Sequence, residues 1–169
     1  FMHPGIRDAE GNSRIGHVWD QSGRNGNTPS MGYGVVFDTP ELIRSAAHDV
    51  SRDTHGTHVA AIAASSADVY KGMAPESDIV VVATDKSESG IIDALAYLLD
   101  YAEKEKKPIA LNLSMGTVIG FKDGTDPIAS IIDELLDQSG NKCRMEMSAG
   151  NEGGRNSTLG SRDTWRREV

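Results

Sequence analysis

The sequence contains the run Ile79-Val80-Val81-Val82-Ala83, which is continuously apolar and mostly β-branched. An alternating pattern would indicate a strand with one face in water, whereas a continuous run is typical of a parallel strand covered on both faces. We therefore expect this run to form a buried central strand.

Helical and strand-like segments alternate after this run. Apolar residues recur at helical spacing over residues 87–102, and a second apolar run follows over 109–113. A second helical pattern opens at Asp126-Pro127, and a third strand-like run covers 143–148. Helices between hydrophobic strands predict right-handed crossovers in an α/β fold, with a mostly parallel sheet between two layers of helices.

The first part of the chain is less regular. Residues 1–36 are rich in glycine, proline and asparagine around a strand-like run over 14–19, which predicts surface hairpins. A capping residue, Thr39, precedes Pro40. We therefore expect a short helix from there to about Ala47.

The composition indicates one compact domain with a sizeable core. The chain has 169 residues, of which 38% are hydrophobic. We expect an irregular entry region over about residues 1–50 and an α/β core over about residues 51–154, both within a partial domain that covers 1–169.

The charge pattern excludes several classes of partner. The formal net charge is -8 and the basic residues are scattered, so neither nucleic acid nor an anionic membrane surface is an expected partner. No apolar run is long enough to cross a bilayer. The single cysteine, Cys143, cannot form an internal disulfide or a cysteine metal cluster.

Residues 53–60 combine a helix-start signal with two histidines. Asp53 or Thr54 can cap the helix, which would place His55 in the first turn. Small alanines further along would let the helix pack closely on the sheet. A histidine that exchanges a proton with a nucleophile needs such a rigid, partly exposed position, because its unperturbed pKa lies near working pH. His55 is therefore the candidate base.

Two other interpretations of this segment stay open. In the first, His55 and its glycine neighbour form an ordinary surface turn. In the second, His55 and His58 bind a metal together with Asp53 or His48, although the glutamate and third ligand of a metalloprotease helix are missing.

Asn151 stands in a glycine-rich loop directly after the third predicted strand. Its side-chain amide could donate a hydrogen bond to an oxygen that develops negative charge during a reaction. The alternative is a turn asparagine that tolerates a left-handed backbone between glycines.

Four segments together resemble motifs of the subtilisin-like serine proteases, or subtilases, and occur in the order of that family. In this sequence they are the histidine signature at residues 53–60, a turn and strand at 72–82, the cleft-wall segment at 112–116, and the oxyanion motif at 148–153. The resemblance implies a subtilisin-like fold, truncated here.

The resemblance also implies roles for individual residues. It makes His55 the general base and Asn151 the oxyanion donor, with Ser114, Met115 and Gly116 in the substrate-binding wall. The family's catalytic aspartate lies in an Asp-Thr/Ser-Gly motif and its nucleophile in a Gly-Thr-Ser motif, and neither triplet occurs in this sequence.

The implied parent protein is a serine endopeptidase that hydrolyses peptide bonds through an acyl-enzyme. Its substrates would be polypeptides, and it would need no organic cofactor. Subtilases often bind structural calcium, but no calcium-ligand loop is recognisable here, and no metal ligand is assigned. The family suggests a secreted or cell-envelope location.

The missing triad members set two further expectations for the chain. We expect it to be inactive alone, and its truncation to favour self-association through uncovered apolar surface. The rival interpretation is a subtilase-like binding module, or pseudoenzyme, without catalysis.

Overall fold

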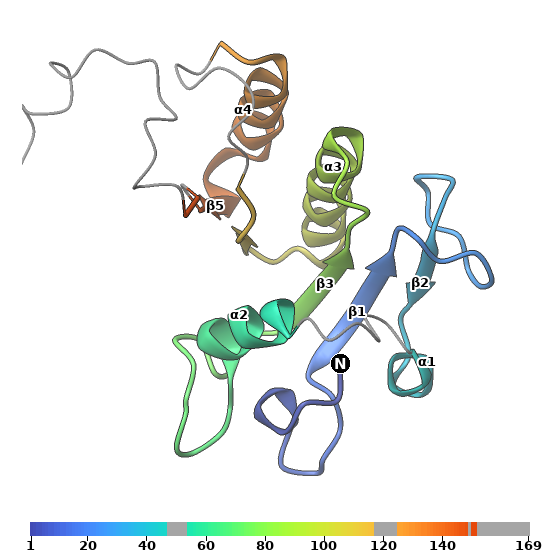
Figure 1. Cartoon of the computed structure of the whole chain (residues 1–169), viewed down its shortest axis with the longest axis vertical. Coiled ribbons are helices and arrows are strands. Elements are labelled where there is room, and N and C mark those ends of the chain that lie inside the picture. The colour runs from blue at the N-terminus through green and yellow to red at the C-terminus, as the bar shows by residue number, and fades with distance from the viewer. Residues whose placement is uncertain (47–53, 117–124, 149, 152–169) are drawn as a thin grey trace, which may run out of the picture. The chain divides into compact units, whose positions relative to one another are not determined.

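The computed structural model describes residues 1–46, 54–116, 125–148 and 150–151. The chain divides into two compact units, Phe1–Asp100 and Tyr101–Val169. Among the described residues, no helix is both long and apolar enough to cross a membrane. The elements follow one another along the chain (Figure 1) as η1 (Pro4–Ile6), β1 (Ile15–Asp20), β2 (Val35–Phe37), α1 (Pro40–Ser45), α2 (His55–Ala64), β3 (Ile79–Ala83), α3 (Glu88–Glu105), β4 (Ile109–Leu113), α4 (Pro127–Ser139), η2 (Gly140–Lys142) and β5 (Cys143–Met147).

The first unit is built on a three-stranded sheet in the order β2-β1-β3 (Figure 1). β1 pairs antiparallel with β2 and parallel with β3. The predicted strand over 14–19 is confirmed as β1, and it pairs antiparallel with the next strand along the chain, as in a hairpin. Its expected surface position is wrong, because β1 is the middle strand. Val18 and Trp19, whose side chains point to opposite faces of the sheet, are both 0% exposed, because apolar residues pack against each of them.

β3 confirms the predicted strand and its parallel pairing but not its central, buried position. It lies at the edge of the described sheet, and all five of its residues are half-buried. The physical reason is that β1 alone pairs with β3 among the residues that the structure describes, so the other edge lacks a described strand partner.

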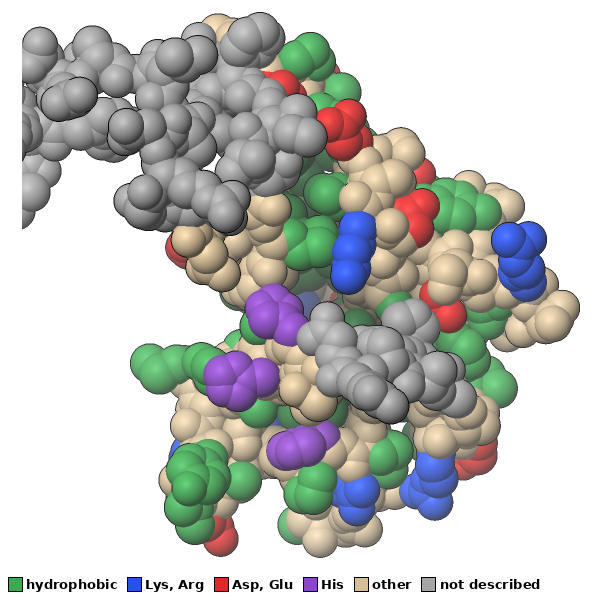
Figure 2. Space-filling model, in the orientation of Figure 1, with side chains coloured by type: hydrophobic (Ala, Val, Ile, Leu, Met, Phe, Trp, Pro, Cys, Tyr) green, Lys and Arg blue, Asp and Glu red, His purple; other side chains and the backbone are tan. Residues whose placement is uncertain are grey.

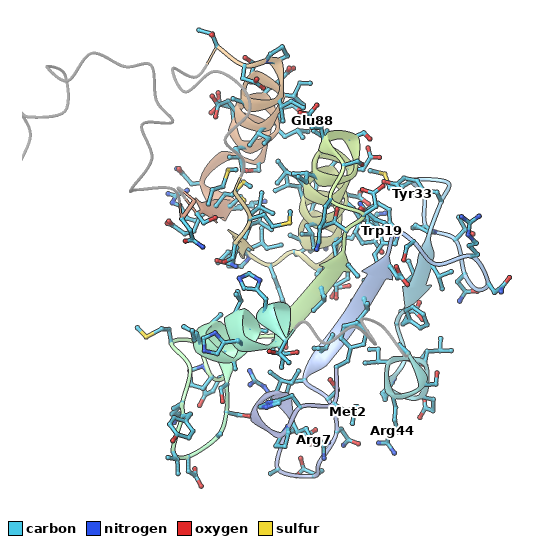
Figure 3. All side chains as sticks on the ribbon, viewed as in Figure 1. Met2, Arg7, Trp19, Tyr33, Arg44 and Glu88 are labelled. Carbon is cyan, nitrogen blue, oxygen red and sulfur yellow. The ribbon has the colours of Figure 1, made fainter. Side chains whose placement is uncertain are left out.

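Among the described residues of the first unit, two apolar clusters stabilise the fold. One contains Ile6, Ile15, Val18 and Ile43. The other surrounds Trp19, whose ring centroid lies 4.7 Å from that of Tyr97 and 5.2 Å from that of Tyr33. The Trp19 indole also donates a hydrogen bond to the Tyr33 carbonyl at 3.2 Å, near the end of β1 (Figure 3).

Helix α1 begins as the sequence predicts. The Thr39 hydroxyl accepts a hydrogen bond from the Leu42 amide, and Pro40 occupies the first turn. The helix ends at Ser45, slightly earlier than the expected end at Ala47, which lies outside the described residues.

A buried glutamine fixes the start of α3. The Gln21 side chain donates to the Gly90 carbonyl at 2.7 Å and accepts from the Asp85 amide at 3.0 Å. The Asp85 carboxylate in turn accepts hydrogen bonds from the hydroxyl and the amide of Ser87, which lower its pKa. These contacts connect the end of β1 with the loop that leads into α3.

The second unit holds a parallel pair, β4 and β5, in the register Ile109↔Cys143 to Leu113↔Met147. α4 connects them, and the Asp126 carboxylate caps this helix by accepting from the Ile128 amide at 2.9 Å. The prediction of a helix opening at Asp126-Pro127 is confirmed.

The protein therefore has a mixed α/β fold with two small, partly parallel sheets. The expected single parallel sheet between two helix layers, and the limits of one partial domain over residues 1–169, remain predictions.

Candidate functional site

The helix that carries the candidate base starts where the sequence places it. α2 begins at His55, and Thr54 is its N-cap residue, with a carbonyl that accepts from the His58 amide at 3.0 Å. The Thr54 side chain makes no capping hydrogen bond, so Thr54 does not supply the expected side-chain cap. Asp53, the other expected cap, lies outside the described residues.

The first turn of α2 lies at the surface of its unit. His55, Gly56 and His58 are exposed, and histidine side chains gather over α2 and the N-terminal segment on the face seen in Figure 2. A Cβ on Gly56 would have no atom within 4 Å in the described structure, so no close backbone approach is seen there. An exposed imidazole in a helical first turn can exchange protons with a bound group.

The other end of α2 is held by the chain that follows it. The Gly72, Met73 and Ala74 amides donate to the carbonyls of Ser65, Ile62 and Ala63 at 2.8, 3.1 and 2.8 Å respectively. Carbonyls at a helix C-terminus have no partner within the helix, so these bonds satisfy groups that would otherwise need water. The Gly-Met-Ala-Pro segment of the sequence therefore anchors the helix of His55.

Arg14 completes this anchor from the N-terminal side of β1. Its guanidinium donates to the Ala64 carbonyl at 2.6 Å and to the Ser77 carbonyl at 2.7 Å. A cation at a helix C-terminus also interacts favourably with the helix dipole. One side chain thus joins the end of α2 to the loop that leads into β3.

The expected close packing of α2 through its alanines is seen only in part. Of the four alanines expected to pack on the sheet, only Ala64 is buried; Ala60 and Ala61 are half-buried and Ala63 is exposed. The close approach is made instead at Gly72, where a Cβ would lie 2.4 Å from the Ser65 backbone nitrogen.

The predicted wall segment directly follows β4 in the second unit. Ser114 and Met115 are half-buried and Gly116 is exposed. The Ser114 hydroxyl accepts a hydrogen bond from the Asn112 side-chain amide at 2.9 Å. This bond orients the side chains at the end of the strand.

The candidate oxyanion loop directly follows β5 in the same unit. Asn151 is exposed, and Gly150 before it has a φ of 88°, a left-handed conformation that favours glycine. A Cβ on Gly116 would lie 3.0 Å from the Gly150 Cα, so the two loops abut. Parallel strands end at the same edge of a sheet, and this brings the Asn151 loop beside the wall segment.

The structure thus places the candidate residues in two groups, with His55 in the first unit and the wall segment and Asn151 in the second. Their roles remain predictions. Of the proposed metal ligands, Asp53 and His48 lie outside the described residues. Within the described ranges, no group of three or more His, Cys, Asp or Glu side chains is placed to hold a metal ion.

Sequence reasoning missed two contributors to this arrangement. Arg14 lies 50 residues from its helix carbonyl partner, and no local pattern signals such a contact. The Ser148 hydroxyl donates to the Met115 carbonyl at 2.8 Å. The signals for Ser148 were its position at the end of the third predicted strand and at the start of the oxyanion motif, and neither of them indicates a bond to Met115.

Comparisons with known proteins agree on one family. A family model described as the subtilase family matches residues 36–167. A solved structure of the CspB protease of Clostridium perfringens is similar to this chain, with a TM-score of 0.70 and 26% sequence identity. The match covers 90% of this chain and 34% of that protease, so the chain spans about a third of its length.

Proposed function

Because this chain belongs to the subtilase family, we propose that it supplies the histidine and the oxyanion-hole part of a serine endopeptidase. The substrates would be polypeptides, cleaved through an acyl-enzyme intermediate. The complete domain would have a mostly parallel sheet covered by helices on both faces, and the parallel pairs β1–β3 and β4–β5 support this arrangement.

His55 acts as the general base in this proposal. It takes the proton of a serine hydroxyl as that oxygen attacks the peptide carbonyl, and it returns the proton to the leaving amine. An aspartate holds the imidazole in the required tautomer and orientation. We expect the serine and the aspartate outside these 169 residues, since neither family triplet occurs within them.

Asn151 stabilises the charge that develops in the same step. Its amide donates to the oxyanion of the tetrahedral intermediate, and Ser114, Met115 and Gly116 hold the substrate backbone beside it. The observation that carries this proposal is the approach of the two loops, with Gly116 against Gly150 at the carboxyl ends of β4 and β5. A substrate bound along the wall would thereby lie next to an amide donor.

A second candidate function is a subtilase-like binding module without catalysis. Both functions are compatible with a segment that contains neither family triplet. The gene on either side of this segment discriminates between the two functions. An encoded Asp-Thr/Ser-Gly motif upstream and an encoded Gly-Thr-Ser motif downstream would support the peptidase. The absence of both motifs from the flanking gene would support the binding module.

The experiment that tests the peptidase is Asn151→Ala in the full-length protein. An oxyanion donor matters more in the transition state than in the bound substrate, so kcat falls while KM stays nearly unchanged. The expected loss in kcat is about a hundred- to a thousandfold, a scale taken from a subtilisin oxyanion asparagine and not worked out from this structure.

The matched control is Asn141→Ala, because Asn141 is also exposed and lies in η2 of the same unit. It should leave both constants unchanged. If Asn151→Ala lowers the melting temperature but leaves kcat intact, Asn151 is a turn residue and has no part in the mechanism.

A further inference from the structure

Ser148 connects the two loops of the second unit through two hydrogen bonds. Its backbone amide donates to the Leu113 carbonyl at 3.2 Å, which extends the pairing of β4 and β5 beyond the strands. Its hydroxyl donates to the Met115 carbonyl at 2.8 Å. Both acceptors lie at the end of β4 or in the wall segment after it.

The backbone is also in close contact at this point. A Cβ on Gly116 would lie 3.0 Å from the Gly150 Cα, 3.4 Å from the Gly150 nitrogen and 3.8 Å from the Ser148 hydroxyl oxygen. The lack of a Cβ on Gly116 therefore lets the two loops approach, and the Ser148 hydroxyl joins them through its hydrogen bond. The hydrogen bond from the Ser148 hydroxyl to the Met115 carbonyl opposes displacement of the wall segment away from Ser148.

We propose that Ser148 is a positioning residue, which fixes the substrate-binding wall relative to the oxyanion donor Asn151. This role rests on the proposed function. The Ser148 hydroxyl is bonded to Met115 backbone, so it acts through the wall segment and does not touch the reacting atoms. Its effect on catalysis arises because a displacement of about 1 Å in a binding group can cost a hundredfold in rate.

Alanine at this position separates the two bonds. Ser148→Ala removes the hydroxyl bond to the Met115 carbonyl but keeps the backbone bond to the Leu113 carbonyl, so the strands stay paired. The released wall segment then samples other positions relative to Asn151. Substrate binding weakens, and the bound carbonyl is less often aligned with the amide donor, so KM rises while kcat falls.

The experiment measures kcat, KM and melting temperature in the full-length protein for wild type, Ser148→Ala and Ser148→Thr. We expect kcat/KM of Ser148→Ala to fall about three- to tenfold, the range of one net hydrogen bond. Threonine keeps the hydroxyl, so Ser148→Thr should restore kcat/KM to within about twofold of wild type.

The matched control is Ser45→Ala. The Ser45 hydroxyl also donates to a backbone carbonyl, that of Leu42, at 2.9 Å, but it lies in α1 of the first unit. This variant should change kcat/KM by less than about twofold, as a surface hydrogen bond away from the site would.

Three outcomes overturn the positioning role. The positioning role fails, while the proposed function stands, if the wild type is active and Ser148→Ala matches Ser45→Ala in kcat/KM, even with a lowered melting temperature. The positioning role also fails, while the proposed function stands, if Ser148→Thr lowers kcat/KM as much as Ser148→Ala does. If the wild type hydrolyses no peptide, the proposed function fails, and the positioning role falls with it.

Discussion

Replacing Gly72 by alanine tests how the helix that carries His55 is held. A Cβ at this position would lie 2.4 Å from the Ser65 nitrogen, 2.7 Å from the Ala64 nitrogen and 2.9 Å from the Ala61 carbonyl oxygen. All three atoms belong to backbone, so no side chain can rotate away to make room. The segment from Gly72 onward must therefore move off the end of α2.

The cost follows from the hydrogen bonds that this movement disrupts. Three backbone bonds join residues 72–74 to the last carbonyls of α2, at 2.8 to 3.1 Å. At about 0.5–1.5 kcal/mol for each bond, their loss amounts to roughly 3 kcal/mol. That is a large fraction of a typical free energy of unfolding, which is about 5–15 kcal/mol.

The assay is urea unfolding of the full-length protein, combined with hydrogen exchange in α2. Gly72→Ala should lower the free energy of unfolding and speed exchange of amides near the end of α2. Gly16→Ala is the matched control, because a Cβ on Gly16 has no atom within 4 Å and its backbone is not left-handed. Its stability should stay within about 0.5 kcal/mol of wild type.

Equal stabilities of the two alanine variants, with unchanged exchange in α2, would refute this reasoning. In that case Gly72 and the residues after it would not anchor the helix. His55 would then owe its position to other contacts.

Two further predictions concern charged and ionisable groups. Arg14→Met should lower the free energy of unfolding by about 1–3 kcal/mol, because the carbonyls of Ala64 and Ser77 lose a charged donor. Arg24 is exposed, so Arg24→Met should have almost no effect, and urea unfolding of both variants checks this. Burial, a hydrogen bond to Asp93 and the negative charge of Asp93 raise the pKa of Tyr33 from 10.0 to about 12. The neutral Tyr33 hydroxyl therefore stabilises the folded state fully below pH 10, and this stabilisation is lost as the pH rises through 12. Stability curves of wild type and Tyr33→Phe should therefore converge over that interval, and a constant separation would contradict the assigned cause.

The sequence predicted the elements whose signals are local. Helix α4 has its cap, its proline and its apolar face within 13 residues, and β4 is a short apolar run between a proline and a polar segment. Such patterns depend on neighbours along the chain, so they can be read without knowledge of the fold.

The arrangement of the sheets could not be predicted in the same way. The central position of β1 depends on pairing with β3, more than 60 residues later, and the sequence around β1 suggested only hairpins. The three residues of β2 carry too little pattern to be recognised alone. Strand order is a property of long-range pairing, which local periodicity does not encode.

In the candidate site, too, the local motifs could be predicted from the sequence and the long-range contacts could not. The histidine helix and the asparagine loop were recognisable because their motifs are continuous in sequence. The contacts that hold them, from Arg14 to Ala64 and from Ser148 to Met115, span 50 and 33 residues. These contacts depend on where loops meet in the folded chain, and residue types alone do not specify that arrangement.

The central claim is that His55 is the catalytic base of a serine endopeptidase. Peptide hydrolysis by the full-length protein, compared between His55→Ala and His58→Ala, tests it most directly. Both histidines are exposed on the same helix, so the two changes perturb the fold similarly. We predict that His55→Ala lowers kcat on the order of a millionfold, a scale known from a subtilisin, while His58→Ala keeps kcat within about tenfold of wild type. Equal activities of the two variants, or an inactive wild type, would contradict the claim.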